Sequence, residues 1–247
     1  MSSLDEAAWD KPTPAEGWSV RDQISHLAFF DEAAAEAVSA PDRFIGGLDA
    51  IARDPVAFME GPLIKGRAGS TNDVLGWWRG ARAAMLDVFE TVDPDVRVPW
   101  YGPPMKPASF ISARLMETWA HGQDVADALS VVRPPTDRLR HIAYLGFRAR
   151  PYSYAANGMT LPDAGVRVEL RGPEGDAWTW GEGDSVVSGD AIDFCLVVTQ
   201  RRHLQDTNVR TVGDAAREWI SIAQAFAGPP GAGRRPGQFP KRGAATE

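Results

Sequence analysis

The sequence has very little cysteine and no long apolar run. Among 247 residues there is one cysteine, so the chain can form neither an internal disulfide nor a cluster of thiolate ligands. No apolar run approaches the roughly 18–20 residues that cross a bilayer. The first residues also lack the basic and apolar regions of a signal peptide. We therefore expect a cytoplasmic protein with no membrane partner.

Positive charge is scarce as well. Lys and Arg total 26 against 33 Asp and Glu, which gives a formal net charge of -7 at pH 7. A nucleic-acid surface needs a concentrated basic patch to displace counterions. The charge balance therefore predicts no nucleic-acid partner.

The chain divides into two parts that differ in the spacing of their apolar residues. Residues 1 to about 130 contain long segments in which apolar residues recur at helical spacing. Beyond the break at 133–135, helical segments alternate with short strand-like runs. These patterns predict an α+β protein with a helical domain over 1–132 and a smaller α/β domain over 133–228. The stretch 229–247 is rich in Gly, Pro and Arg, and we expect it to be a disordered tail.

Three long helices are expected in the first part. One begins at Ser19, with Asp22 three residues later as in a capping box, and continues to about residue 39. The others cover about 70–92 and 108–129. The segment 41–69 holds three prolines and several glycines, which favour a loop with one or two short helical turns.

The second part mixes helices and strands. A helix is expected over 139–148, and the alternating runs 166–170 and 177–180 predict a β-hairpin. Two further helices are predicted, one from Asp190 through Arg202 and one from Asp214 through Phe226.

A stripe of polar residues lies on the third predicted helix. Glu117, His121 and Asp124 are separated by four and three residues, so their side chains project from one face. His26 lies in the middle of the first long helix, and a buried histidine needs a partner for each ring nitrogen. A divalent cation held by His26, Glu117 and His121 would meet that need. Two imidazoles, one carboxylate and an open position are typical of catalytic zinc.

Spacing alone leaves other interpretations open. A Glu and a His four residues apart are more often a surface pair on a helix. A single helical histidine such as His26 is more often a satisfied core or surface residue. Cys195, within an apolar run, is expected to be a small buried hydrophobe.

Two motifs together resemble a known family. They are Gly17-Trp18-Ser19-Val20-Arg21-Asp22-Gln23-Ile24-Ser25-His26 and Glu117-Thr118-Trp119-Ala120-His121-Gly122-Gln123-Asp124. Both are similar to the metal-binding domain of mycothiol-dependent maleylpyruvate isomerases, within the DinB-like superfamily of four-helix bundles. The resemblance covers residues 1 to about 130. It implies that His26, Glu117 and His121 bind the metal, with zinc as the expected ion.

The resemblance extends more loosely to the second part. The C-terminal domain of that family is sterol-carrier-like, and in it an apolar helix ends in an arginine that faces the active site. The matching residue here is Arg201, although Gln200 replaces the family's glycine. Its guanidinium would bind a carboxylate substrate through paired hydrogen bonds. The alternative is a solvated helix end, where a cation also favours the helix dipole.

One departure from the family concerns the first helix. DinB-like bundles have a full helix before the Trp-containing loop, whereas this chain offers only the fragment 5–9. Either the natural N-terminus is longer, or the bundle is open along one side. An open side would expose apolar faces and favour association into a homo-oligomer.

The resemblance implies an isomerase or thiol transferase that uses mycothiol, a low-molecular-weight thiol, on a small electrophilic substrate. The metal would lower the pKa of the bound thiol. Asp124 is expected to orient a ligand imidazole or to transfer protons. The alternative is a non-catalytic metal or small-ligand-binding module, in which a fourth protein ligand would close the metal site.

Overall fold

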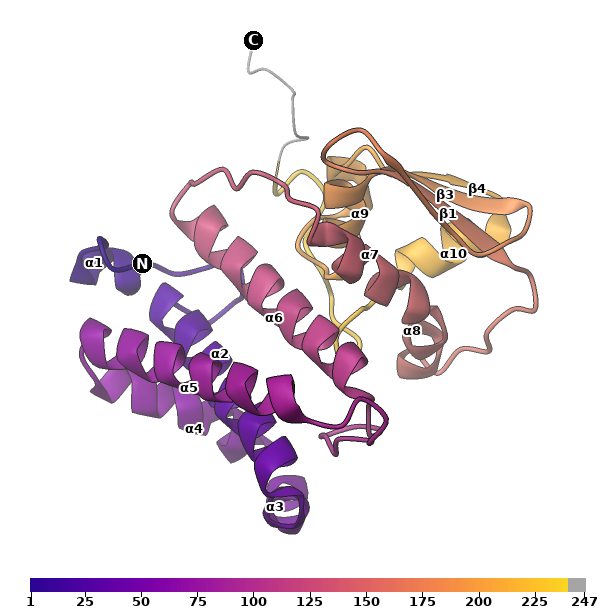
Figure 1. Cartoon of the computed structure of the whole chain (residues 1–247). Coiled ribbons are helices and arrows are strands. Elements are labelled where there is room, and N and C mark those ends of the chain that lie inside the picture. The colour runs from indigo at the N-terminus through magenta and orange to yellow at the C-terminus, as the bar shows by residue number, and fades with distance from the viewer. Residues whose placement is uncertain (240–247) are drawn as a thin grey trace. The chain divides into compact units, whose positions relative to one another are not determined.

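The computed structural model describes residues 1–239, apart from the side chains of Ala50 and Ala52. The chain forms two compact units, one from Met1 to Arg133 and one that begins at Pro134. Figure 1 shows helices in the first unit, and helices together with a small sheet in the second. The predicted α+β class with a helical N-terminal part is confirmed. Within residues 1–239, no helix combines the length and the apolar character that crossing a membrane requires.

Helix α2 (Val20–Ser39) is the central element of the first unit, because it contacts all five of the other helices in that unit. Its cap is the predicted one: the Ser19 hydroxyl accepts from the N–H of Asp22 at 3.3 Å, and the Asp22 carboxylate accepts from the N–H of Ser19 at 2.9 Å. The helices of this unit are α1 (Glu6–Trp9), α2 (Val20–Ser39), α3 (Pro41–Arg53), α4 (Pro55–Ala68), α5 (Thr71–Thr91) and α6 (Pro107–Ala128).

The prediction of a loop over 41–69 is wrong, because this segment forms α3 and α4. Pro41 and Pro55 stand at the start of these two helices. A residue in the first helical turn has no intrahelical partner for its N–H, so proline is accepted there and can begin a helix. Pro62 lies inside α4 without ending it.

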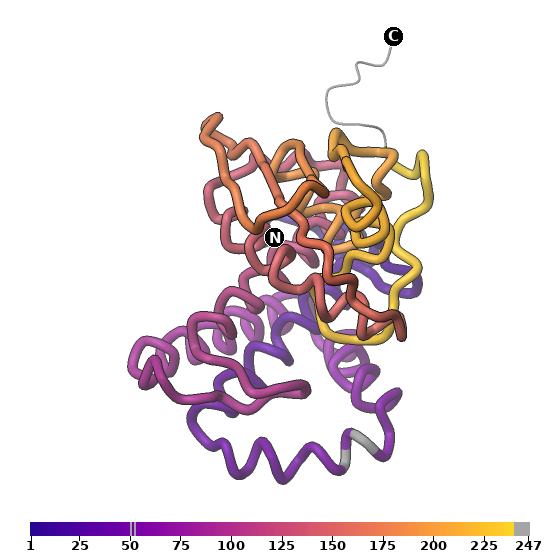
Figure 2. Tube along the Cα trace, turned by 90° about the vertical axis from the view of Figure 1, so that its right-hand side faces the viewer, coloured from indigo at the N-terminus to yellow at the C-terminus, as the bar shows by residue number. Residues whose placement is uncertain are grey.

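Two apolar clusters form the core of the first unit. Trp9 is 1% exposed, so the four-residue α1 contributes a large buried side chain to one of them. The connection between α5 and α6 folds back on itself (Figure 2). A bridge between Val98 and Met105 closes this connection, which supplies Val98 to the other cluster. The first cluster consists of Trp9, Val20, Ile24, Val74, Leu75 and Val125, and the second of Ala33, Ala34, Ala37, Phe44, Met85, Val98 and Phe110.

Gly66 allows the close approach of α4 to α2. A Cβ atom at this position would lie 1.8 Å from Oγ and 2.7 Å from Cβ of Ser25. Gly66→Ala is therefore expected to destabilise the protein by about 1–3 kcal/mol, because the two helices must move apart. Gly61→Ala in the same helix meets open space, and its higher helix propensity should stabilise by up to about 1 kcal/mol. Urea unfolding of both variants tests the contact, and equal stability of the two would contradict it.

The second unit is built around a mixed sheet. The strand order is β2-β1-β3-β4, with β1 parallel to β3 and the other two pairs antiparallel. The predicted hairpin of β1 and β2 and the helix over 139–148 are confirmed, whereas β3, β4 and α8 were not predicted. The elements are α7 (Leu139–Arg148), α8 (Arg150–Ala156), β1 (Val166–Arg171), β2 (Ala177–Trp180), β3 (Ser185–Asp190), α9 (Ala191–Val198), η1 (Leu204–Asp206), β4 (Arg210–Val212) and α10 (Asp214–Ser221).

Helix α9 ends earlier than the sequence predicts. The expected helix through Arg202 stops at Val198, because Gln200 has a φ of 58°, a left-handed conformation that commonly ends helices. Glycine adopts this conformation without strain. Gln200 therefore adopts, despite its Cβ, a conformation that favours glycine. The second of the two predicted helices is also shorter than expected, since α10 ends at Ser221.

The end of the second unit contacts the residues that follow α9. Residues 229–239 form neither helix nor strand, yet the N–H of Gly237 donates to Oδ1 of Asp206 at 2.8 Å. The guanidinium of Arg202 lies 3.9 Å from the ring centre of Phe239. The remainder of the predicted disordered tail, residues 240–247, lies outside the described residues.

Candidate metal centre

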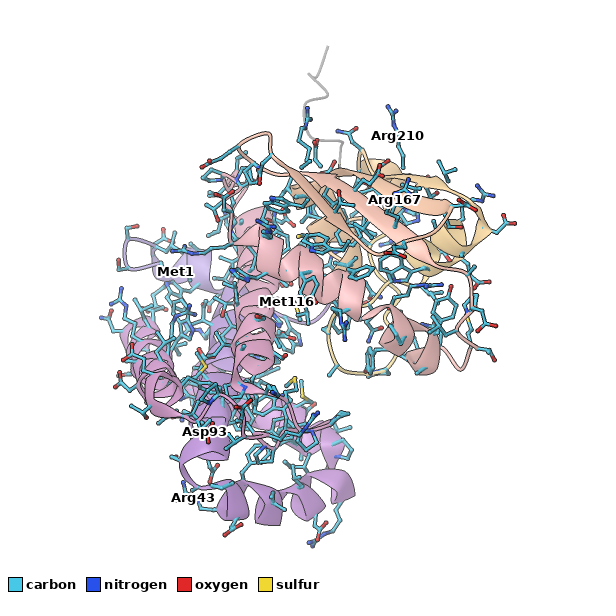
Figure 3. All side chains as sticks on the ribbon, turned by 45° about the vertical axis from the view of Figure 1, so that its right-hand side comes forward. Met1, Arg43, Asp93, Met116, Arg167 and Arg210 are labelled. Carbon is cyan, nitrogen blue, oxygen red and sulfur yellow. The ribbon has the colours of Figure 1, made fainter. Side chains whose placement is uncertain are left out.

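Helices α2 and α6 bring together the three residues that the sequence predicts as ligands. His26 lies on α2, and Glu117 and His121 lie on α6; one nitrogen or oxygen atom of each lies within 4.8 Å of the others. Nε2 of His121 is 3.2 Å from Oε2 of Glu117, and the centres of the His26 and His121 rings are 4.4 Å apart. In Figure 3, Met116 marks the place on α6 just before Glu117. This donor set and its compactness fit a divalent cation.

Aromatic rings surround the two imidazoles. The Trp18 ring stacks on His121, with an interplanar angle of 15° and 5.9 Å between ring centres, and it also lies 5.1 Å from His26. Phe30 lies one turn after His26 on α2, and the centres of their two rings are 4.5 Å apart. Both histidines are only 8% exposed. The rings therefore restrict the orientation of the imidazoles and keep most water away from them.

The charge of Glu117 is favoured by its neighbours. Burial alone would raise the pKa of this carboxyl. The hydrogen bond and charge of His121, with smaller contributions from Arg114 and His26, outweigh burial and lower the pKa of Glu117 to about 2. Glu117 is therefore a carboxylate at neutral pH, the form that binds a cation.

A buried ion pair connects the same two helices close to the centre. Arg114 of α6 donates to Oδ1 of Asp31 of α2 through Nη2 at 2.9 Å and Nε at 3.1 Å. Their side chains are 5% and 0% exposed. Arg114 precedes Glu117 by three residues, one helical turn, so the pair holds α2 and α6 together beside the candidate ligands.

The other predicted site residues lie in different surroundings. Asp124 is fully buried on α6, one turn after His121. Arg201 belongs to the second unit, where Nη1 donates to the carbonyl of Thr199 at 2.7 Å. The structure also places Gln23 against the candidate centre, with Oε1 2.5 Å from Nδ1 of His121. Helical spacing from His26 could have placed Gln23 on the same side of α2, one turn earlier, but not its contact with α6.

The sequence has close and distant relatives. Residues 1–126 match the protein family described as the mycothiol maleylpyruvate isomerase N-terminal domain. Two uncharacterized proteins, from two strains of Mycobacterium tuberculosis, are each 47% identical to this chain over 236 residues. These alignments cover 95% of this chain and 92% of each relative.

Two solved structures share the fold. A crystal structure of a histidine-to-alanine mutant of the mycothiol-dependent maleylpyruvate isomerase matches with a TM-score of 0.55 and 16% identity, over 85% of this chain and 84% of that one. A second crystal structure of that isomerase matches with a TM-score of 0.54 and 17% identity, over 81% and 82% of the two chains. At this level of identity, the comparison establishes the fold.

Proposed function

Because the chain belongs to the family of the mycothiol maleylpyruvate isomerase N-terminal domain, we propose that His26, Glu117 and His121 hold one divalent cation, zinc. The observation that carries this proposal is the convergence of the three ligand atoms within 4.8 Å of one another. Two imidazoles and one carboxylate are a set found in catalytic zinc sites, where a fourth position stays open for water or substrate.

We propose further that the protein is a mycothiol-dependent isomerase or thiol transferase acting on a small electrophilic substrate. A bound divalent cation lowers the pKa of a thiol ligand and so supplies a thiolate nucleophile at neutral pH. The low pKa of Glu117 keeps that ligand charged. The rings of Trp18 and Phe30, packed on the two histidines, limit water at the centre.

Two more residues have proposed roles in this reaction. Asp124, buried one turn after His121, is proposed to orient a ligand imidazole or to transfer protons. Arg201 is proposed to bind a carboxylate of the substrate through its guanidinium. Both roles come from the family resemblance together with the chemistry of the side chains.

The thiol chemistry can be tested with Co(II) in place of zinc. We expect the visible spectrum of the Co(II) protein to change on addition of mycothiol, because sulfur would enter the open coordination position. His121→Ala protein exposed to the same Co(II) and mycothiol concentrations is the control, and it should show no such change. A Co(II) protein that responds to no small thiol would contradict the enzyme proposal and favour a non-catalytic metal-binding module.

A further inference from the structure

Gln23 connects the proposed ligand His121 to the loop that precedes α2. Its side chain is fully buried, and its Oε1 lies 2.5 Å from Nδ1 of His121. At the other end of the amide, Nε2 donates to Oγ1 of Thr13 at 2.9 Å. The hydroxyl of Thr13 in turn donates to the carbonyl of Trp18 at 2.8 Å. A continuous chain of hydrogen bonds therefore runs from the loop to the imidazole.

Backbone contacts fix the loop end of this chain. The carbonyl of Trp18 also accepts from the N–H of Thr13 at 2.7 Å, and the N–H of Val20 donates to the carbonyl of Lys11 at 3.0 Å. Thr13 is thus held by both its backbone and its side chain. Because its one hydroxyl hydrogen is directed to Trp18, Oγ1 acts as an acceptor toward Gln23.

The direction of these bonds determines which nitrogen of His121 carries the hydrogen. The NH₂ group of Gln23 faces Thr13, so its carbonyl oxygen faces His121, and a carbonyl can only accept. Nδ1 must therefore donate, which leaves Nε2 as the nitrogen whose lone pair a cation can use. Nε2 is the atom that lies 3.2 Å from Glu117, on the side of the candidate centre.

We propose that Gln23 is a positioning residue that keeps a hydrogen on Nδ1 of His121 and so reserves Nε2, the nitrogen beside Glu117, for binding the cation. This inference rests on the proposed function, because the hydrogen on Nδ1 matters for metal binding only if His121 is a ligand. Hydrogen-bond partners of ligand histidines set the tautomer and the ring orientation, and losing one typically lowers metal affinity by about 10–100-fold.

The hydrogen on Nδ1 can be observed without any metal. In metal-free protein, long-range proton–nitrogen NMR should show a hydrogen on Nδ1 of His121. Gln23→Glu keeps an acceptor in place and should preserve this hydrogen, whereas Gln23→Leu should allow Nδ1 to lose it. A wild-type His121 without a hydrogen on Nδ1 would overturn the proposal.

Zinc affinity, measured by competition with a chelator, gives an independent readout. Gln23→Leu should bind zinc about 10–100-fold more weakly than wild type, and Gln23→Glu should restore most of the loss. Gln224→Leu, which removes a buried glutamine of the second unit, is the matched control and should bind as wild type does. Unchanged affinity in Gln23→Leu, or an equal loss in Gln224→Leu, would overturn the proposal. If the wild type bound no zinc, the proposed function would fail, and the NMR result alone would decide the role of Gln23.

Discussion

Replacing His121 with alanine is expected to remove zinc from the purified protein. The substitution deletes one of three ligands and leaves His26 and Glu117, which are too few to hold the ion tightly. The loss of affinity should exceed the roughly 10–100-fold that follows the loss of a hydrogen-bond partner of a ligand. Elemental analysis after dialysis, followed by chelator competition, measures it. We expect close to one equivalent of zinc in the wild type and much less in the variant.

Three further variants complete this experiment, and the last of them is its control. His26→Ala should behave as His121→Ala does, and Glu117→Gln should also bind zinc weakly, because a neutral amide replaces the carboxylate. His141→Ala changes an exposed residue of α7 in the second unit and should retain the full zinc content. Zinc content that is unchanged in both His26→Ala and His121→Ala would show that the ion, if present, is bound elsewhere.

The largest loss of stability is expected from breaking the ion pair of Arg114 and Asp31. Arg114→Met leaves the Asp31 carboxylate, which is 0% exposed, without its cation. Removing one partner of a buried pair typically costs about 3–5 kcal/mol, because the remaining charge stays desolvated. Urea unfolding followed by circular dichroism of the helices, most of which lie in the first unit, measures the change.

Two comparisons separate the buried charge from other effects. The double variant Arg114→Met with Asp31→Leu should recover much of the stability, because apolar residues often replace a buried pair at little cost. Asp95→Ala breaks the exposed pair of Asp95 and Lys106 and should unfold close to the wild type, since exposed pairs contribute little. A single variant Arg114→Met as stable as wild type would contradict the assigned role of the pair.

Local patterns in the sequence predict much of the fold. The Ser19 and Asp22 cap, the apolar spacing of α5 and α6, and the β1–β2 hairpin are all encoded within a few residues of each element. The error over 41–69 arose because proline can either break or begin a helix, and only packing against α2 distinguishes the two. Strand β3 pairs directly with β1, although β2 lies between them in the sequence. The partner of β3 could therefore not be predicted from neighbouring residues.

The candidate site also combines residues that the sequence predicts with contacts that it does not predict. The spacing on α6 placed Glu117, His121 and Asp124 on one face, and the family motif added His26 from α2. Gln23 carries no comparable pattern, since its partner His121 is 98 residues away. The pair of Asp31 and Arg114, separated by 83 residues, is equally invisible to spacing. Such contacts depend on how α2 packs against α6, which only the folded structure provides.

The location of the metal tests the central claim most directly. Crystals of the zinc-loaded protein, measured at the zinc absorption edge, should give an anomalous difference peak bounded by His26, Glu117 and His121. Its nearest protein atoms should be Nε2 of His121 and one oxygen of Glu117, together with a ring nitrogen of His26. A peak elsewhere in the chain, or no peak between these three residues in zinc-loaded crystals, would contradict the proposed centre.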